Sequence, residues 1–353
     1  MVKTPNIRSL SQEALKDFLV SHGEKPFRSN QIMEWLWTHG VKSFAEMTSL
    51  SKSTRALLEA HFELDSIVLE DRQVSTDGTI KCAFSAGPTQ VVEGVLIPTT
   101  SRTTACISSQ VGCSLACSFC ATGKLKLLKN LSAGEIVDQV RHLKNEAETV
   151  YQRSLSNIVY MGMGEPLLNY KNVLQSIEHI TSDPGMGMSP KRITVSTAGI
   201  AKMIKKLGDD EVKFNLALSL HAANDVKRSK IMEINDSNNL ATLAEALRYF
   251  HEKTGSRVTF EYIIFKDFND ELQDAKELAV FCRNVPCKIN IIEYNPIDDA
   301  DFRQADPAKV DAFANYLEEK CNLIVNVRRS RGKDIDAACG QLANKNKAVK
   351  KSA

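Results

Sequence analysis

The sequence lacks any long apolar run. Across its 353 residues, no uncharged apolar stretch approaches the roughly 18 residues that a membrane-spanning helix needs. The opening residues 1–5 also lack the apolar core of a secretory signal peptide. We therefore expect a protein that stays in the reducing cytoplasm and has no membrane partner.

A large excess of charge of either sign is absent too. The 45 Lys and Arg residues nearly balance the 43 Asp and Glu residues, and the net charge of +2 does not by itself require a nucleic-acid partner. Local basic clusters still allow a polyanion, although each cluster alone is typical of a solvated surface. These clusters are Lys124, Lys126 and Lys129; Arg328, Arg329, Arg331 and Lys333; and Lys345, Lys347, Lys350 and Lys351.

Cysteine, in contrast, is present nine times, which in a reducing compartment indicates metal binding or catalysis rather than a disulfide framework. Cys113, Cys117 and Cys120 follow the spacing C-x3-C-x2-C, so three thiolates can converge from one loop. This arrangement suits a four-iron cluster in which one iron stays open to a small molecule. The alternative is a structural zinc site, but zinc needs four closed ligands and the next histidine is His142, on an expected helix. Ordinary packing is expected for Cys82, Cys282, Cys287 and Cys321.

Four segments of the chain differ in periodicity. Residues 1–65 show amphipathic helical patterns, which fit either a module that packs against the rest of the chain or a small helical module that grips RNA. Residues 66–100 change to the short alternating runs of a small β extension. Residues 101–342 alternate between strand-like and helix-like segments, and residues 343–353 form a basic tail.

Within the β extension, Glu93 lies among Val and Ile residues. We expect its side chain to face outward rather than to occupy a site that raises its pKa.

Six strand-then-helix units follow residue 101, and a seventh strand ends the series. This succession predicts an α/β fold with a parallel sheet that curls into a barrel and is covered by helices. The expected strands are residues 103–107, 157–161, 192–196, 213–219, 257–264, 288–292 and 323–328. The expected helices are residues 132–147, 171–181, 200–207, 240–253, 271–283 and 309–320.

Polar residues and glycines follow several of these strands, and in a parallel barrel the carboxyl ends of the strands form the active site. The positions are Cys113–Cys120, Gly162–Glu165, Ser196–Thr197, Ser219–His221 and Asn295. Each has an ordinary alternative, such as a turn for the glycines, a helix cap for Ser196 or a satisfied core histidine for His221. Because all of them share one end of the barrel, we interpret them together as one site.

These residues resemble the radical S-adenosylmethionine (SAM) superfamily, whose signature is the same cysteine spacing. Longer blocks resemble the RNA adenine methyltransferases of that superfamily, and the resemblance covers most of the chain, including its helical start. The blocks are residues 106–113 (CISSQVGC), 162–169 (GMGEPLLN), 219–221 (SLH) and 334–342 (DIDAACGQL). The resemblance implies a partial (β/α)6 TIM-like radical SAM barrel with an N-terminal helical domain of RNA-binding type and a small β extension.

The resemblance also implies a role for each matching residue. Cys113, Cys117 and Cys120 would bind a [4Fe-4S] cluster. Cys339 would be methylated during turnover, Cys106 would be its resolving partner, and Glu93 would accept or relay a proton. The residues that would bind SAM are Gly164, Glu165, Ser196, Ser219, Leu220, His221 and Asn295.

The implied target is carbon 2 of an adenine, which is electron-poor and has no nucleophilic lone pair. Ordinary attack on the SAM methyl group therefore fails, and the resemblance implies a radical route with two SAM molecules per turnover. One SAM would methylate Cys339, and the other would yield a radical that takes a hydrogen from the new S-methyl group. The resulting carbon would add to the adenine, and Cys106 would free the product through a transient disulfide.

The implied substrates are 23S rRNA at the peptidyl transferase centre and the adenine 3′ to the anticodon in some tRNAs. An electron donor such as flavodoxin is also implied, and we expect a monomer. One alternative is a resistance-type relative that methylates carbon 8 of the same rRNA adenine, although Pro166-Leu167-Leu168 resembles the carbon-2 group more closely. A zinc-stabilised RNA-binding module without catalysis is the more distant alternative.

Overall fold

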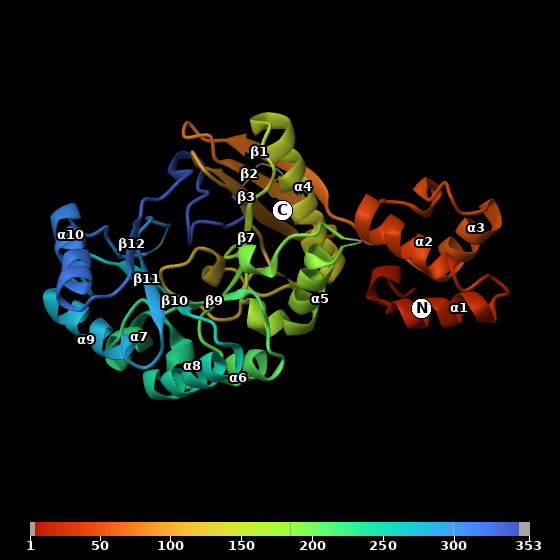
Figure 1. Cartoon of the computed structure of the whole chain (residues 1–353). Helices are drawn as coiled ribbons and strands as arrows, with labels where there is room; N and C mark the ends of the chain where they lie inside the picture. The colour runs from red at the N-terminus through yellow and green to blue at the C-terminus, as the bar shows by residue number, and fades with distance from the viewer. Residues whose placement is uncertain (1–3, 184, 299, 346–353) are drawn as a thin grey trace.

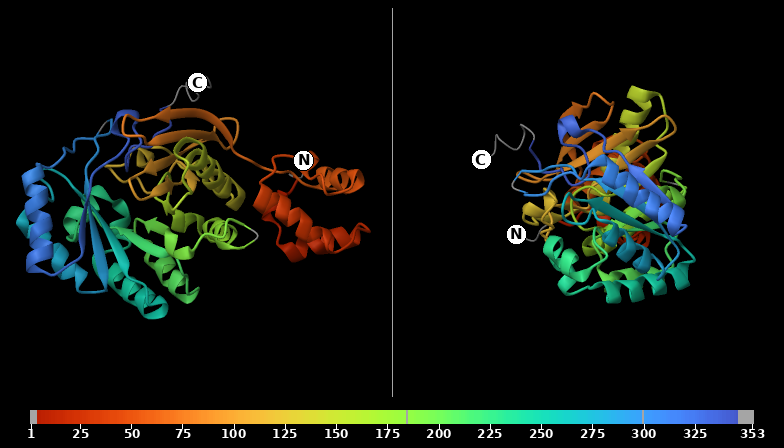
Figure 2. Two further views of the ribbon diagram at one scale, coloured as in Figure 1. Left: turned by 45° about the horizontal axis from the view of Figure 1, so that its top comes forward. Right: turned by 90° about the vertical axis from the view of Figure 1, so that its left-hand side faces the viewer.

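The computed structural model describes residues 4–183, 185–298 and 300–345. Ten strands form one sheet in which the strands lie in the same order as along the chain. Helices cover the outside of the sheet, and a helical domain projects from one end (Figures 1 and 2). The α/β fold class predicted from the sequence is confirmed.

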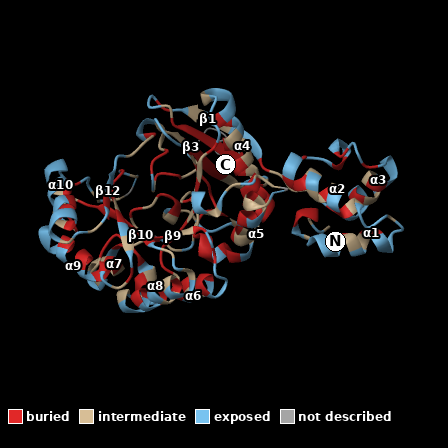
Figure 3. Ribbon diagram, viewed as in Figure 1, coloured by how far each residue is buried: buried red, intermediate tan, exposed pale blue. Residues whose placement is uncertain are grey.

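The parallel part of the sheet contains seven strands. They are β4 (Thr103–Cys106), β7 (Asn157–Tyr160), β8 (Ile193–Thr197), β9 (Asn215–Ser219), β10 (Val258–Ile264), β11 (Cys287–Glu293) and β12 (Val325–Arg328). The helices between them are α4 (Ala133–Tyr151), α5 (Tyr170–Thr181), α6 (Ala201–Asp209), α7 (Asp225–Ile231), α8 (Leu240–Thr254), α9 (Leu272–Cys282) and α10 (Pro307–Asn315). Buried residues line the sheet, while the outer faces of the helices are exposed (Figure 3). The first and last strands of the sheet do not pair, so the barrel is partial, as predicted.

The β extension is the antiparallel end of this same sheet. Its strands are β1 (Val68–Val74), β2 (Ile80–Ser85) and β3 (Val91–Pro98), and β3 pairs antiparallel with β4. Helix α4 covers one face, where Leu143 lies close to Gly94 of β3. Residues 329–345, which we call the C-terminal segment, meet the other face: the Asn344 side-chain amide donates to the carbonyl of Val91 at 2.8 Å.

The expectation that Glu93 faces outward is wrong. Its side chain is fully buried, because both faces of β3 are covered and neither meets solvent. The alternating pattern of the strand could not show this, since the covering chain comes about 250 residues later in the sequence. The last part of the expected basic tail, residues 346–353, lies outside the described residues.

The N-terminal residues form helices α1 (Gln12–Ser21), α2 (Arg28–Glu34) and α3 (Lys52–His61). Ser11 and Ser51 cap α1 and α3 by accepting the backbone N–H three residues later. In Figure 1 these helices project beyond α4 and α5, and the domain contacts both through Trp37, whose ring stacks on His179 of α5 and whose carbonyl accepts a hydrogen bond from Nη2 of Arg141 of α4 at 2.8 Å. Arg8 pairs with Asp138 of α4 at 2.8 Å, and both side chains are largely buried.

Two local features differ from the sequence expectations. The second helix extends from α2 into one π-helical turn, Trp35–His39, and α10 extends in the same way into Tyr316–Lys320. Helix α7 was not predicted, because its seven residues offer too short a periodic pattern. In the described ranges, no helix is both long and apolar enough to cross a membrane.

Candidate active site

A cavity of about 240 Å³ opens at the carboxyl ends of the parallel strands. Ten of the residues singled out from the sequence line it: Cys106, Cys113, Cys117, Cys120, Gly164, Glu165, Ser196, Ser219, His221 and Cys339. The other three, Glu93, Leu220 and Asn295, do not line the cavity, but each is hydrogen-bonded to a residue near it. The structure therefore gathers the polar strand ends around one cavity, in the arrangement that the sequence predicted.

The cysteine loop is held by short-range backbone bonds. The two short strands β5 (Gln110–Val111) and β6 (Lys129–Asn130) pair on either side of it. Within the loop, Cys120 N–H donates to the Cys117 carbonyl at 3.1 Å. Gly123 must be glycine, since a Cβ there would stand 2.8 Å from the Cys117 oxygen. These bonds fix the backbone from which all three thiols project.

The three thiols of this loop influence one another. Burial raises the pKa of Cys113 to about 11, and the neighbouring Cys120 thiol contributes to the rise. Burial also raises the pKa of Cys117, with further contributions from Cys120 and Cys113. Three soft sulfur donors on one wall fit an iron–sulfur cluster, whose positive iron would favour their thiolate forms.

The segment after β7 brings backbone close to the cavity. Gly164 has φ +92°, and a Cβ at this position would lie 2.4 Å from Cβ of Gln110. The next residue, Glu165, is buried and accepts the backbone N–H groups of Leu167 at 3.0 Å and Ala198 at 2.7 Å. Burial raises the pKa of Glu165, and these two bonds oppose the rise. Its carboxyl group thereby fastens the end of β7 to the end of β8.

His221 follows β9 in a left-handed conformation, with φ +55°. Its Nδ1 accepts the backbone N–H of Ile263 at 3.1 Å, and the Phe119 ring of the cysteine loop meets it edge-on at 4.8 Å. Burial lowers the pKa of His221 to about 3, so the imidazole is neutral at physiological pH. Beside it, the hydroxyl groups of Ser196 and Ser219 lie 3.4 Å apart.

Sequence reasoning missed Arg228, which supports this wall from behind. Its guanidinium is fully buried and donates to the carbonyl oxygens of Ala198 at 2.6 Å and Leu220 at 3.1 Å. Burial lowers the pKa of Arg228 to about 10. The signal that could have found it is Asn224, which caps α7 by accepting the Lys227 N–H at 3.2 Å.

Cys106 and Cys339 reach the cavity from opposite ends of the domain. Cys106 ends β4 and is buried. Cys339 lies in the C-terminal segment, is exposed and lines the cavity. Burial and the nearby Cys339 thiol raise the pKa of Cys106 to about 12. The residue after Cys339 is tied to the cysteine loop, because Ala121 N–H donates to the Gly340 carbonyl at 2.8 Å.

An ion pair between an exposed arginine and a buried acid lies beside these two thiols. Arg328 at the end of β12 and Glu261 of β10 both line the cavity, and Arg328 Nη1 lies 3.5 Å from Glu261 Oε2. Loss of bulk water raises the pKa of Cys339, and the Arg328 guanidinium opposes that rise. Sequence reasoning did not single out Glu261, although it is the one acid in the buried strand Val258–Ile264. An acid in such a strand is itself the signal that could have found it.

Glu93 anchors the C-terminal segment behind the cavity. Its Oε2 accepts the backbone N–H groups of Ala343 at 2.9 Å and Asn344 at 3.1 Å. Its Oε1 lies 3.5 Å from Nζ of Lys81, which is also buried. The carboxylate therefore holds the chain that carries Cys339, and it is not among the groups that line the cavity.

Two basic side chains line the cavity, and two more follow the cysteine loop along the chain. Arg329 and Arg331 line the cavity, and Lys124 and Lys126 are exposed on the loop that follows the three cysteines. Arg329 is paired with Glu293, and Arg331 lies 3.7 Å from Asp77. We call these four side chains the basic rim, and their charge suits a polyanionic substrate.

Comparisons with known proteins agree with this geometry. Residues 5–64 match the ribosomal RNA large subunit methyltransferase N-terminal domain, and residues 107–279 match the radical SAM superfamily. A probable dual-specificity RNA methyltransferase RlmN from Cytophaga hutchinsonii is 60% identical over 98% of this chain and 94% of its own length. Another from Anaeromyxobacter dehalogenans is 42% identical over 96% of this chain and 92% of its own length.

Among solved structures, a radical SAM methyltransferase from Sphaerobacter thermophilus is 37% identical to this chain. The comparison gives a TM-score of 0.88 and covers 96% of this chain and 99% of that one. Membership in the radical SAM superfamily implies a [4Fe-4S] cluster and SAM. Full-length similarity and the shared fold together show that this chain belongs to the RlmN family of radical SAM RNA methyltransferases.

Proposed function

We propose that this enzyme methylates carbon 2 of an adenine in 23S rRNA, at the peptidyl transferase centre, and of the adenine 3′ to the anticodon in some tRNAs. The observation that carries the proposal is the cavity itself. It brings the thiol of Cys339 to the same space as Cys106 and the three-cysteine loop, although Cys339 lies more than 200 positions later in the sequence. A single-step methyl transfer would have no use for two further cysteines there.

Cys113, Cys117 and Cys120 would hold the [4Fe-4S] cluster. SAM would lie against Gly164, Glu165, Ser196, Ser219 and His221, with Leu220 and Asn295 supporting this wall from behind. When bound, the cluster and SAM supply the electron, the methyl group and the hydrogen-abstracting radical, with two SAM molecules used per turnover. The protein side chains hold these groups in place and exclude water.

Cys339 would accept a methyl group on its sulfur and carry it to the adenine. The attacking species is the thiolate, and the Arg328 guanidinium beside it favours that form. The basic rim would hold the RNA phosphates while the adenine is unstacked and turned into the cavity. Because its chain segment has no regular strand or helix around residue 339, the sulfur can reach both the SAM wall and the adenine.

Cys106 would release the product. After a carbon–carbon bond joins the Cys339 methylene to the adenine, the Cys106 thiolate would attack the Cys339 sulfur. Before that attack, the adduct would lose one electron, which the bound cluster could take up, and the proton on carbon 2, which Glu93 or a water that it holds would accept or relay. The attack would form the Cys106–Cys339 disulfide and break the bond between the Cys339 sulfur and the methylene carbon. That carbon would then take up one proton to become the methyl group.

The remaining alternative is methylation of carbon 8 of the same rRNA adenine, which would use the same five cysteines. The sequence Pro166-Leu167-Leu168 and the dual-specificity names of the relatives favour carbon 2 and two RNA classes. Cluster-loaded enzyme, SAM and a one-electron donor such as flavodoxin should convert 23S rRNA and tRNA to 2-methyladenosine. Nucleoside mass spectrometry distinguishes this product from 8-methyladenosine, and formation of the latter would overturn the proposal.

Two further properties are proposed with this function. The enzyme would act as a monomer, since all the residues assigned to the site come from one chain. It would also work in the cytoplasm, where a reducing environment keeps Cys106 and Cys339 available as thiols between turnovers. Size-exclusion chromatography with light scattering checks the first of these properties.

A further inference from the structure

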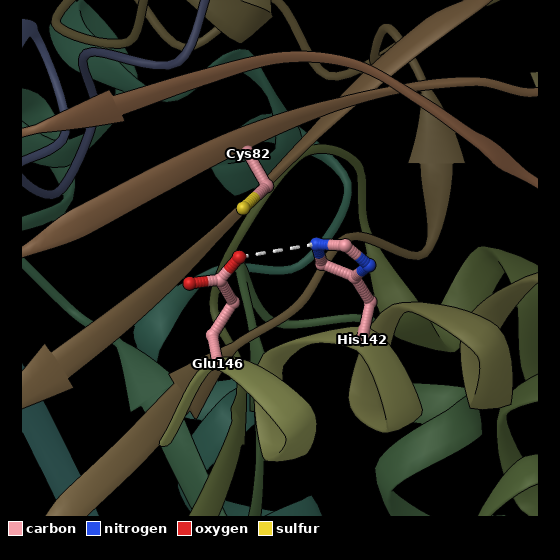
Figure 4. Close-up of side chains that lie close together, drawn as sticks. All are labelled: Cys82, His142 and Glu146. Carbon is pink, nitrogen blue, oxygen red and sulfur yellow. Dashed lines mark ion pairs between the residues drawn. The ribbon is translucent and has the colours of Figure 1, made fainter. Parts of the chain in front are cut away.

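A second group of metal-binding side chains lies away from the active site, where the β extension meets α4. Cys82 of β2 faces α4, and His142 and Glu146 lie one turn apart on that helix (Figure 4). The thiol, an imidazole nitrogen and a carboxylate oxygen all lie within 4.8 Å of one another. His142 Nε2 and Glu146 Oε1 are 3.7 Å apart.

The His142 nitrogen carries an unmet bonding requirement. Its Nε2 is buried and has no hydrogen-bond partner among the described residues. A buried nitrogen of this kind is costly unless something binds it. Burial lowers the pKa of His142, so the ring is neutral and presents a lone pair. The edge of the ring is partly exposed, with 28% of the side chain accessible, which gives a small ion a path into the site.

The Glu146 carboxylate is already held in place. Arg72 of β1 donates through Nε to both carboxylate oxygens at 3.1 Å, and through Nη2 to Oε2 at 3.0 Å. Hydrogen bonds of this type commonly orient a carboxylate that binds a metal. Oε1, which accepts one of these bonds, also faces the imidazole, as the dashed line in Figure 4 shows.

We propose that Cys82, His142 and Glu146 bind one zinc ion, with water as the fourth ligand. Sulfur, imidazole and carboxylate donors in a tetrahedral set are typical of zinc. Zinc–ligand distances of about 2.0–2.3 Å place tetrahedral donors about 3.4–3.6 Å apart, close to the separation of the imidazole and carboxylate atoms. The other donor atoms lie within 4.8 Å of one another, so their separations need to shrink by at most about 1.3 Å, which side-chain rotation supplies.

Binding replaces the thiol proton of Cys82 with a zinc–sulfur bond, and the proton passes to solvent. Zinc affinity should therefore rise by about tenfold for each pH unit across the neutral range. This dependence distinguishes a thiolate site from a histidine–carboxylate pair, for which the proton cost at neutral pH is small.

The site would fasten two elements that support the active site. Cys82 pairs across the sheet with Gly94, the neighbour of Glu93, and alternation along the strand places the Lys81–Glu93 pair on the opposite face. Helix α4 carries Gln139, which bonds both backbone groups of Ser108 at 2.9 and 3.0 Å. Zinc would thus stabilise the framework, and the proposed methyl transfer does not depend on it.

The first test is metal analysis of cluster-loaded enzyme after a chelator wash. Wild-type protein should retain about one zinc per chain in addition to its iron. Cys82→Ser and His142→Gln should lose the zinc and keep the iron, whereas Cys321→Ala, a half-buried cysteine elsewhere, should keep both. Wild-type protein without zinc, or Cys82→Ser protein with it, would overturn the proposal.

The second test removes competition from the iron-binding cysteines. In the full chain with Cys113, Cys117 and Cys120 changed to alanine, cobalt(II) should produce a thiolate-to-metal charge-transfer absorption. Adding Cys82→Ser should abolish that band. Zinc should also raise the unfolding temperature of the triple variant and leave that of the quadruple variant unchanged. A band that survives Cys82→Ser would show that another cysteine is the ligand and would refute the site.

Discussion

Two cysteine-bearing segments meet at the cavity, and they are held in different ways. The loop Cys113–Cys120 is bounded by the β5–β6 pair and fixed by its own turns and backbone bonds. The C-terminal segment, residues 329–345, contains only a short 3-10 turn, Lys333–Ile335. It is held mainly by residues of other elements: the acids Asp77, Glu93 and Glu293, and Ala121 and Thr122 directly after the three cysteines.

The difference matches what the proposed reaction would require of each segment. A cluster would need three sulfurs at fixed positions, which short-range bonds provide. A sulfur that would first meet a methyl donor, then an adenine and then a second thiol would need a segment that can shift. Anchoring through side chains outside the segment leaves the backbone around Cys339 free of regular structure while fixing both of its flanks.

Removing the Cys339 sulfur should have the largest effect. Cys339→Ala should lower RNA methylation by about 10⁴-fold or more while the iron content stays normal, because the residue does not belong to the cysteine loop. Cys113→Ala should abolish activity and lower iron content together. Methylation assays paired with iron analysis separate the two segments. An active Cys339→Ala enzyme would contradict the assignment, and Cys321→Ala serves as the matched control.

Removing the buried thiol should trap rather than prevent the reaction. Cys106→Ala should form the carbon–carbon bond to RNA but lack the thiolate that releases it, so a covalent adduct through Cys339 should accumulate. A denaturing gel with labelled RNA detects the adduct, and the Cys106→Ala/Cys339→Ala double variant should form none. Normal product with no adduct would count against the proposed release step.

The Arg328 charge beside Cys339 should influence how the rate of methyl transfer to that sulfur depends on pH. Since the pKa of Cys339 is raised above its usual value, the thiolate fraction and the rate of methyl transfer to Cys339 should grow about tenfold per pH unit through the neutral range. Arg328→Gln removes the opposing charge and should lower the rate at neutral pH by about three- to tenfold, with Arg328→Lys largely restoring it. Peptide mass spectrometry of S-methylcysteine measures this, and a flat pH profile would argue against thiolate attack.

Replacing Asp77, one of the acids that hold the C-terminal segment, should have the smallest effect. Burial raises the pKa of Asp77, but bonds from Thr79, Gly332 and Ser75 outweigh it and lower the pKa to about 2. A lowered carboxyl pKa gives stability that is present above the unfolded value near 4 and is lost as pH falls through about 2. Asp77→Asn should therefore destabilise the protein by about 1 kcal/mol at pH 7, and by less near pH 2.

Urea unfolding at both pH values measures this difference. Asp17→Asn, an exposed acid on α1, is the control and should change little at either pH. Equal losses for Asp77→Asn at pH 7 and pH 2 would show that the carboxylate charge is not the source of the effect.

Much of the fold could be predicted because it rests on local signals. The capping box Ser132–Glu135 opens α4 as expected, and the strand–helix alternation correctly located the sheet and the end where polar residues gather. What failed depended on contacts between distant parts of the chain. Glu93 was misjudged because residues 343–344 cover it, and Arg228 was missed because its partners are carbonyl groups on other strands. Cys82 was correctly expected to be buried, but its neighbours on α4 could not be identified from spacing.

The anchoring of the C-terminal segment has a consequence for synthesis on the ribosome. Ser75, Asp77 and Glu93 emerge about 250 residues before the segment that they bind. A nascent chain can therefore pair the antiparallel strands β1–β3 long before the last reactive sulfur arrives. A product that ends between residues 328 and 339 would contain every strand of the sheet and still lack that sulfur, so it would be inert.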